Sequence, residues 1–390
     1  MLRTFLTLGL LVTTVAAAEL PLVDKRIFET RDFRTFGGEV IPQVRVGWEA
    51  YGELDEDRSN VILVTHHFSG TSHAAGRYSP DDAEPGYWDA IIGPGKAIDT
   101  DRFYVISSDT LVNANVHDAR VITTGPASID PRTGRPFGLD FPVVTIRDFV
   151  EVQARLLDSL GIERLHAVIG ASMGSMQALE WAVAYPERVE RMVSVIGAGR
   201  MRPWEIAVLE SWAWPIRLDP NWNGGDYYDG IAPLDGLTAS MAMVTQQALH
   251  PDFFSASFPA HANISPGVLD SVTNGFEVVD WLWQRAGERA RTMDANHVLY
   301  LVRASQAFVA GHANDMAGAM GKVQAKSMFL PAAGDLLLRP ELAREAKRVL
   351  ESRDKAVSLH EIEGRMGHLD GLTAIHDQAD RLARFLEPES

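Results

Sequence analysis

The chain has 390 residues, no cysteine and a formal net charge of −16 at pH 7. The missing cysteines exclude disulfides, Fe–S clusters, Cys-ligated zinc and a cysteine nucleophile, and the acidic balance disfavours nucleic acid and anionic membranes as partners. The length and an apolar fraction of 46% suit one large α/β domain with an insertion, or two domains.

The first residues have the pattern of a secretory signal peptide. Arg3 precedes the apolar run FLTLGLLVTTVA, and three alanines at 16–18 end this run before Glu19. A basic start, a short apolar run and small residues at its end are typical of a cleaved signal. The alternative is an N-terminal membrane anchor, which the shortness of the run disfavours. We therefore expect removal of residues 1–18 and an exported protein, periplasmic or extracellular, that has no membrane attachment after cleavage.

Continuous apolar runs predict the strands of a mostly parallel sheet, because such runs are typical of strands covered on both faces. Helical patterns lie between several of these runs, and the alternation of strand and helix predicts an α/β fold with helices on both sides of the sheet. The predicted strands are 44–52, 60–68, 103–109, 165–172, 191–199, 327–335 and 356–364, and the predicted helices are 146–161, 175–186, 339–353 and 371–388.

The stretch 203–315 breaks this alternation and is mainly helical in pattern. We interpret it as a helical cap inserted into an α/β core, of which 19–202 is the first part and 316–390 the second. Six of the nine tryptophans fall in this stretch. They either pack the core of the cap itself or line an apolar pocket. They are Trp204, Trp212, Trp214, Trp222, Trp281 and Trp283.

The sequence GASMG at 170–174 is a GxSxG motif with Ser172 at its centre. Glycines on either side of a serine allow a sharp turn from a strand into a helix, which exposes the hydroxyl as a nucleophile. An apolar run, LHAVI, precedes the motif, and a helical pattern, SMQALEWAVAYP, follows it. This context favours a nucleophile over the alternative, a tight turn without chemistry.

A serine nucleophile needs a base and an acid. In a fold of this kind the three residues follow one another along the chain in the order Ser, acid, His. Asp335 ends an apolar run before a predicted helix, and His368 follows the last predicted strand in the stretch GRMGHLDGL. Alternative roles are a helix N-cap for Asp335 and a capping or surface histidine for His368. Asp370 is a rival acid, but it lies too near His368 in sequence for the usual geometry.

Two backbone N–H groups are expected to form an oxyanion hole. One belongs to Met173, directly after the nucleophile, and the other to Phe68 or His67 in the loop after an early strand. The pair His66–His67 also suggests a metal site, but adjacent residues of a strand point to opposite faces. We expect no metal, and no nucleotide cofactor because no P-loop or GxGxxG spacing occurs.

Over nearly the whole mature chain the sequence resembles the homoserine O-acetyltransferase family of the α/β-hydrolase superfamily. The motifs that carry the resemblance are GYWDAIIGPGKAIDTDRFYVISSD (86–109), TTGPASIDPRTGRPFGLDFPVVTIRDFV (123–150), GASMGSMQALEWAVAYPERVERMV (170–193), NGGDYYDG (223–230), MDANHVLYL (293–301) and GHLDGL (367–372). The resemblance implies a catalytic triad of Ser172, Asp335 and His368, with Phe68 as oxyanion donor. It also implies acyl transfer from acyl-CoA to the serine and then to a hydroxyl, and a dimer through the cap helices.

Departures from the family pattern concern the substrate pocket. The family's carboxylate-binding arginine aligns with Ala213, between Trp212 and Trp214, and a family tyrosine aligns with Trp281. An alanine there removes the cation that an amino-acid carboxylate needs, unless another arginine, Arg202 or Arg217, reaches the pocket. The turn TLVNANVHDAR (110–120) and the motif GDLLLRP (334–340) also depart from the family.

Three functions remain open. The leading one is an exported serine ester hydrolase acting on a small-molecule acyl substrate, since an exported enzyme would not meet cytoplasmic acyl-CoA and water can resolve an acyl-enzyme. The second is an O-acyltransferase that uses the same triad and a hydroxyl acceptor. The third is a non-catalytic protein that binds a small molecule in an aromatic pocket.

Overall fold

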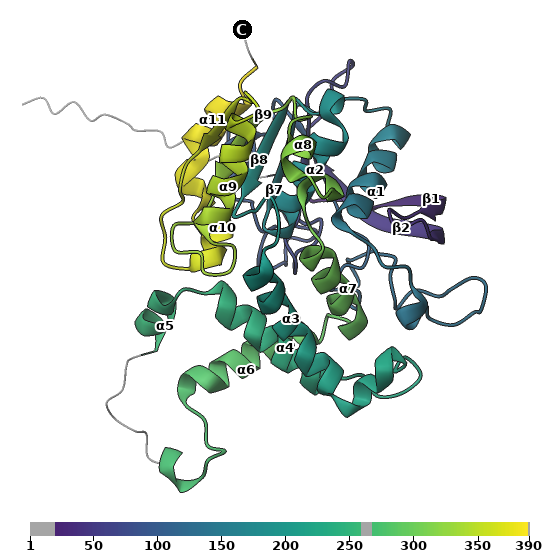
Figure 1. The fold of residues 1–390 in the computed structure, drawn as a ribbon, viewed down its shortest axis with the longest axis vertical. Helices are drawn as coiled ribbons and strands as arrows, with labels where there is room; N and C mark the ends of the chain where they lie inside the picture. The colour runs from purple at the N-terminus through teal and green to yellow at the C-terminus, as the bar shows by residue number, and fades with distance from the viewer. Residues whose placement is uncertain (1–19, 259–266, 389–390) are drawn as a thin grey trace, which may run out of the picture.

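An eight-stranded sheet forms the centre of the computed structural model, which describes residues 20–258 and 267–388 (Figure 1). The strand order is β1-β2-β6-β3-β7-β8-β9-β10. β1 pairs antiparallel with β2 and β2 antiparallel with β6, whereas every other neighbouring pair is parallel. The predicted α/β fold with a mostly parallel sheet is confirmed. The strands are β1 (Arg26–Arg34), β2 (Val40–Tyr51), β3 (Val61–Thr65), β6 (Tyr104–Ser108), β7 (Ala167–Ala171), β8 (Arg191–Val195), β9 (Lys326–Leu330) and β10 (Val357–Leu359), and β4 (Ile92–Gly93) pairs with β5 (Ile98–Asp99) in a separate small sheet.

The central strands β3, β7 and β8 are buried at every position, as their continuous apolar sequences predict. Strand β1 was not predicted, because five of its nine residues are charged and only Phe28 and Phe33 point into the core. The predicted signal peptide lies outside the described residues. No helix within those residues is long and apolar enough to cross a membrane.

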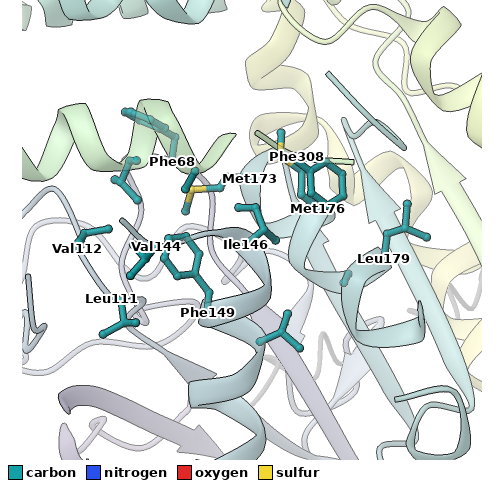
Figure 2. Packing of buried hydrophobic residues seen from close by; sticks show 14 of the residues in the cluster. Phe68, Leu111, Val112, Val144, Ile146, Phe149, Met173, Met176, Leu179 and Phe308 are labelled. Atoms are coloured by element: carbon teal, nitrogen blue, oxygen red, sulfur yellow. The ribbon is translucent and has the colours of Figure 1, made fainter. Parts of the chain in front are cut away.

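Helices cover both faces of the sheet and create two hydrophobic clusters. One cluster includes residues of α1, α2 and α9, and the other includes residues of α11 and of the segment around Trp88. Figure 2 shows part of the first cluster, where side chains of α1 pack close to Phe68 and Met173. These helices are α1 (Ile146–Ser159), α2 (Met173–Ala184), α9 (Pro340–Glu351) and α11 (Ala379–Leu386).

The C-terminal segment is not the single helix predicted at 371–388. It divides into α10 (Asp370–Thr373), a 3-10 turn at Ile375–Gln378 and α11. The indole N–H of Trp88 donates to the Gly371 carbonyl at 3.1 Å. This carbonyl would accept from residue 375 in a continuous helix, so the contact helps to end α10.

Most of the helical segment between β8 and β9 lies beyond one end of the sheet, whereas its last helix, α8 (Met316–Met320), packs against α9 beside the sheet (Figure 1). In this segment α3 packs on α4 and α7, and α4 packs on α6. The boundaries proposed for a cap remain a prediction. Its helices are α3 (Pro203–Leu218), α4 (Leu234–Ala248), α5 (Pro251–Ser257), α6 (Glu277–Ala290), α7 (Ala295–Gln306) and α8 (Met316–Met320).

The tryptophans of this segment divide into three groups. Trp222 donates its indole N–H to Asn296 and so packs within the segment. Trp212 and Trp281 line the large cavity described below. Trp204, Trp214 and Trp283 are at least half exposed, so they neither pack within the segment nor line the cavity.

A partly buried histidine, His312, predicts how the stability of the fold depends on pH. Burial, together with Arg147, lowers the pKa of His312 from 6.5 to about 4, and its Nε2 accepts the Arg147 N–H. Between about pH 6.5 and pH 4 the unfolded chain therefore binds a proton at His312 that the folded chain does not bind. As a result, the free energy of unfolding falls as the pH falls through this range. The free energy of unfolding of the wild type should fall between pH 7 and pH 5. We expect His312→Asn to make this fall smaller by up to about 2 kcal/mol.

Urea denaturation of the wild type and the variant at these two pH values measures this difference. His376→Asn, which replaces an exposed histidine, is the control. An equal pH dependence in wild type and His312→Asn would contradict the prediction.

Candidate active site

Ser172 lies on a sharp turn between β7 and α2. Its φ is 56°, a strained conformation for a residue with a side chain. The flanking glycines permit this turn, because a Cβ on Gly174 would lie 2.0 Å from the Thr65 carbonyl oxygen and a Cβ on Gly170 would lie 2.2 Å from the Gly174 oxygen. No side chain fits at either position without moving the backbone.

The structure brings Ser172, His368 and Asp335 together from three separate parts of the chain. His368 Nε2 lies 2.8 Å from Ser172 Oγ, and its Nδ1 lies 2.6 Å from Asp335 Oδ2. All three residues are buried, with residue exposures of 8%, 6% and 2% respectively. An imidazole held in this way can take a proton from the hydroxyl while the carboxylate fixes its orientation.

Asp335 is itself held by the chain that follows it. Its Oδ1 accepts the backbone N–H groups of Leu337 and Leu338 at 2.8 and 2.9 Å, which leaves Oδ2 for the histidine. The rival acid, Asp370, accepts instead from the backbone N–H of Met366, and burial raises the pKa of this carboxyl. Of the two carboxylates, Asp335 is the one that contacts His368.

The two predicted oxyanion donors are free to bind an oxygen. Among the residues that the structure describes, the backbone N–H groups of Phe68 and Met173 donate no hydrogen bond. Met173 begins α2, so its N–H has no acceptor within the helix. The Phe68 ring packs edge-on against Trp212 with ring centroids 5.3 Å apart.

A polar network fixes the loop that carries Phe68. His66 Nε2 accepts the Thr110 N–H and its Nδ1 donates to the His67 carbonyl, so both ring nitrogens are engaged. Asn113 and Asn115 donate to the carbonyls of Gly70 and Ser69. These asparagines belong to the turn at 110–120, and they tie this turn to the loop. Nowhere in the described ranges do three or more His, Asp or Glu side chains form a group able to hold a metal.

Two cavities meet at Ser172. The larger has a volume of about 550 Å³, and Ser172, His368, Phe68, Trp212 and Trp281 are among its lining residues. The smaller has a volume of about 30 Å³, and Phe68, Met173 and Trp212 also line it. The nucleophile therefore faces a narrow space and a wide one.

The predicted pocket residues are only partly brought together. Trp212 and Trp281 line the large cavity, whereas Ala213 is buried outside it and Trp214 is 53% exposed. The assignment of Ala213 and Trp214 to the substrate pocket stays a prediction, and neither residue is among those that line the described part of this cavity. The reason is helical geometry, since consecutive residues of α3 point in directions about 100° apart.

The arginines named as possible replacements do not reach the site either. Arg202 pairs with Glu345 and Arg217 pairs with Glu210, and neither lines the two cavities. The cations of the large cavity are Arg285 and Arg289 of α6. Their i, i+4 spacing is visible in the sequence, but such a pair usually marks a solvated helix face and is therefore no signal for a site.

The histidine beside the nucleophile is neutral. Burial, with His66, Arg289 and His368 nearby, lowers the pKa of His67 from 6.5 to about 3. Across neutral and mildly acidic pH, His67 therefore adds no charge to the cavity. In the described part of this cavity, Arg285, Glu288 and Arg289 are the lining residues with permanently charged side chains.

Comparisons with known proteins agree with this architecture. Residues 98–346 match the α/β-hydrolase fold family. A homoserine O-acetyltransferase of Deferribacter desulfuricans is 37% identical over 91% of this chain and 93% of that protein. Among solved structures, esterase E22 is 56% identical with a TM-score of 0.92, covering 94% of this chain and all of that one. A homoserine O-acetyltransferase of Bacillus anthracis is 36% identical with a TM-score of 0.91, covering 95% and 99%.

The sequence motifs, the sheet order and these similarities over most of the chain point to one group of proteins. The chain therefore belongs to the homoserine O-acetyltransferase family of enzymes with the α/β-hydrolase fold.

Proposed function

We propose that the chain forms an acyl-enzyme at Ser172 and passes the acyl group to a hydroxyl oxygen. The observation that carries this proposal is the chain of hydrogen bonds from Ser172 Oγ through His368 to Asp335. The free N–H groups of Phe68 and Met173 beside it support it as well. A binding protein would not need a strained serine paired with an oriented imidazole, so the non-catalytic alternative is the weakest.

The proposed mechanism has two balanced steps. Ser172 Oγ bonds to the carbonyl carbon of an ester while His368 Nε2 takes the hydroxyl proton, and the oxyanion lies between the N–H groups of Phe68 and Met173. The bond from carbon to the alcohol oxygen then breaks, and His368 returns the proton to that oxygen. An incoming hydroxyl repeats these events in reverse and frees Ser172.

An alcohol acceptor is the first candidate. The curated relatives favour it, since proteins named homoserine O-acetyltransferase match along almost all of this chain. The cavity of about 550 Å³ beside Ser172 has room for an acceptor alcohol as well as for water. This reading makes the chain an O-acyltransferase.

Water is the second candidate acceptor, and it was the leading expectation from the sequence. One observation favours it: the solved structure with 56% identity is named an esterase. The N-terminal pattern at 1–18 supports export, and we propose a periplasmic or extracellular location, where acyl-CoA is not the expected donor. The chain would then be an ester hydrolase.

Replacing the nucleophile tests acyl-enzyme formation. We expect Ser172→Ala to lower kcat/KM for p-nitrophenyl acetate by at least about 10³-fold, because no other group can hold the acyl. A fluorophosphonate probe labels the wild type at Ser172 and leaves the variant unlabelled. Ser211→Ala, which removes a hydroxyl from α3 that bonds only to the Val208 carbonyl, is the control and keeps the activity. Equal activity of Ser172→Ala and wild type overturns the proposal.

Product analysis separates the two acceptors. With p-nitrophenyl acetate and a series of added alcohols, we expect an ester product whose ratio to acetate exceeds the molar ratio of alcohol to water. The physical reason is that a bound alcohol gains proximity over bulk water. Mass spectrometry and acetate titration measure the ratio. Acetate as the sole product rejects the alcohol candidate and leaves the hydrolase.

The narrow cavity predicts a preference for short acyl chains. A volume of about 10–15 Å³ holds one water-sized group, so the small cavity of about 30 Å³ admits a short chain only. Leu209→Ala on α3 enlarges it, and we expect the hexanoyl-to-acetyl ratio of kcat/KM to rise by about tenfold. Ile206→Ala on the exposed side of the same helix is the control. A ratio that Leu209→Ala does not change would place the acyl chain elsewhere.

A further inference from the structure

Arg289 is a partly buried cation without a carboxylate partner. It lies on α6 and lines the same cavity as Ser172 and His368. Its Nη1 donates to Thr245 Oγ1 at 2.9 Å, and the Thr245 hydroxyl donates in turn to the Met241 carbonyl at 2.8 Å. Within residues 20–258 and 267–388, no Asp or Glu forms an ion pair with Arg289.

Holding Arg289 in this way lowers the stability of the protein when no ligand is bound. A guanidinium removed from water and held only by a neutral hydroxyl loses hydration without gaining an opposite charge. Accordingly, burial and the nearby Arg285 lower the pKa of Arg289 to about 10, so the side chain stays charged at neutral pH. An anion that entered the cavity would restore the missing partner, and a carboxylate matches the fork of a guanidinium.

The neighbouring charges also favour an anion. Arg285 lies one helical turn before Arg289 and lines the cavity too. Its partner, Glu288, is 3.7 Å away, and both side chains are about half exposed, so this contact is weak. Glu288 is the sole carboxylate lining the described part of the cavity. A positively charged ammonium would therefore find little to bind it here.

The small cavity, which Ser172 also lines, differs in the charge that it carries. Glu205, which is 1% exposed, lines it, and one of its oxygens bonds to Arg339 at 2.9 Å. The other oxygen has no hydrogen-bond partner among the described residues. Glu205 forms an ion pair with Arg339, and no cationic side chain is among the described residues that line this cavity. An anionic acyl chain would find no partner there, so the anion belongs to the alcohol half of the ester.

We propose that the large cavity binds the ester of a hydroxy acid whose alcohol half places a carboxylate on Arg289 and carries no ammonium group. The uncharged short acyl chain occupies the small cavity. This inference rests on the proposed acyl-enzyme chemistry and applies to either acceptor. The hydroxy acid leaves with the proton from His368 when the acyl-enzyme forms, and it enters by the reverse path when it is the acceptor.

Three acetyl esters of one chain length test the proposal. They are those of 4-hydroxybutanoate, of its neutral amide and of homoserine, which adds an ammonium group. We expect the wild type to prefer the carboxylate ester to the amide by about tenfold to hundredfold in kcat/KM, the effect of one charge-assisted hydrogen bond. We also expect it to prefer the carboxylate ester to the homoserine ester. The preference should reside mainly in KM, because the contact lies away from the reacting carbon.

Variants of α6 assign the preference to one residue. Arg289→Gln should lower the carboxylate-to-amide ratio to near one, and Arg289→Lys should keep part of it because the charge remains. Arg291→Gln, an exposed arginine at the end of the same helix, should leave the ratio unchanged. Circular dichroism checks that each variant is folded.

The outcomes separate this inference from the proposed function. Turnover of all three esters without charge preference, or a ratio that Arg289→Gln leaves intact, overturns the carboxylate site and leaves the acyl-enzyme standing. A faster reaction with the homoserine ester overturns the exclusion of an ammonium group. No turnover of any ester together with no labelling of Ser172 overturns the proposed function itself.

Discussion

The contact between the end of β3 and the start of α2 is the constraint on which the site depends. The Thr65 hydroxyl donates to the Gly174 carbonyl at 2.8 Å, and the two backbones approach so closely that no side chain fits at Gly174. This approach fixes the turn that holds Ser172. It also brings the loop after β3 beside the first turn of α2, so that Phe68 and Met173 lie on neighbouring segments (Figure 2).

The parallel pairing of the strands brings Asp335 and His368 to the same edge of the sheet as Ser172. β7, β8 and β9 are parallel neighbours, so their carboxyl ends lie at one edge of the sheet. Ser172 follows β7, Asp335 follows β9, and His368 comes after β10 at the same edge. One histidine can then contact both partners although it is 196 residues from the serine. The geometry follows from the topology and needs no unusual local structure beyond the strained serine.

The sequence predicted those features that have a local signature. Apolar runs identified the central strands, and the two glycines around Ser172 identified the turn, because each pattern reflects a steric or burial demand at that position. β1 was missed because its charged side chains conceal a strand that buries only Phe28 and Phe33. The pocket was predicted poorly for a related reason. Which face of α3 or α6 meets the cavity depends on how these helices pack against α4, and no residue pattern within α3 or α6 records that packing.

For the choice of ligand, the positions of the charged side chains matter more than the net charge of the chain. A net charge of −16 repels anions at long range, so electrostatic steering cannot account for an anionic ligand. Inside the cavity, however, solvent screening is weaker, and a single guanidinium outweighs distant surface carboxylates. Glu205 lines the small cavity, where we propose the acyl chain, and Arg289 lines the large one. A substrate with its carboxylate at the acyl end would meet Glu205, and the same substrate reversed would meet Arg289. The carboxylate site proposed at Arg289 would thus select an orientation as well as a ligand, and the orientation determines which carbonyl reaches the serine.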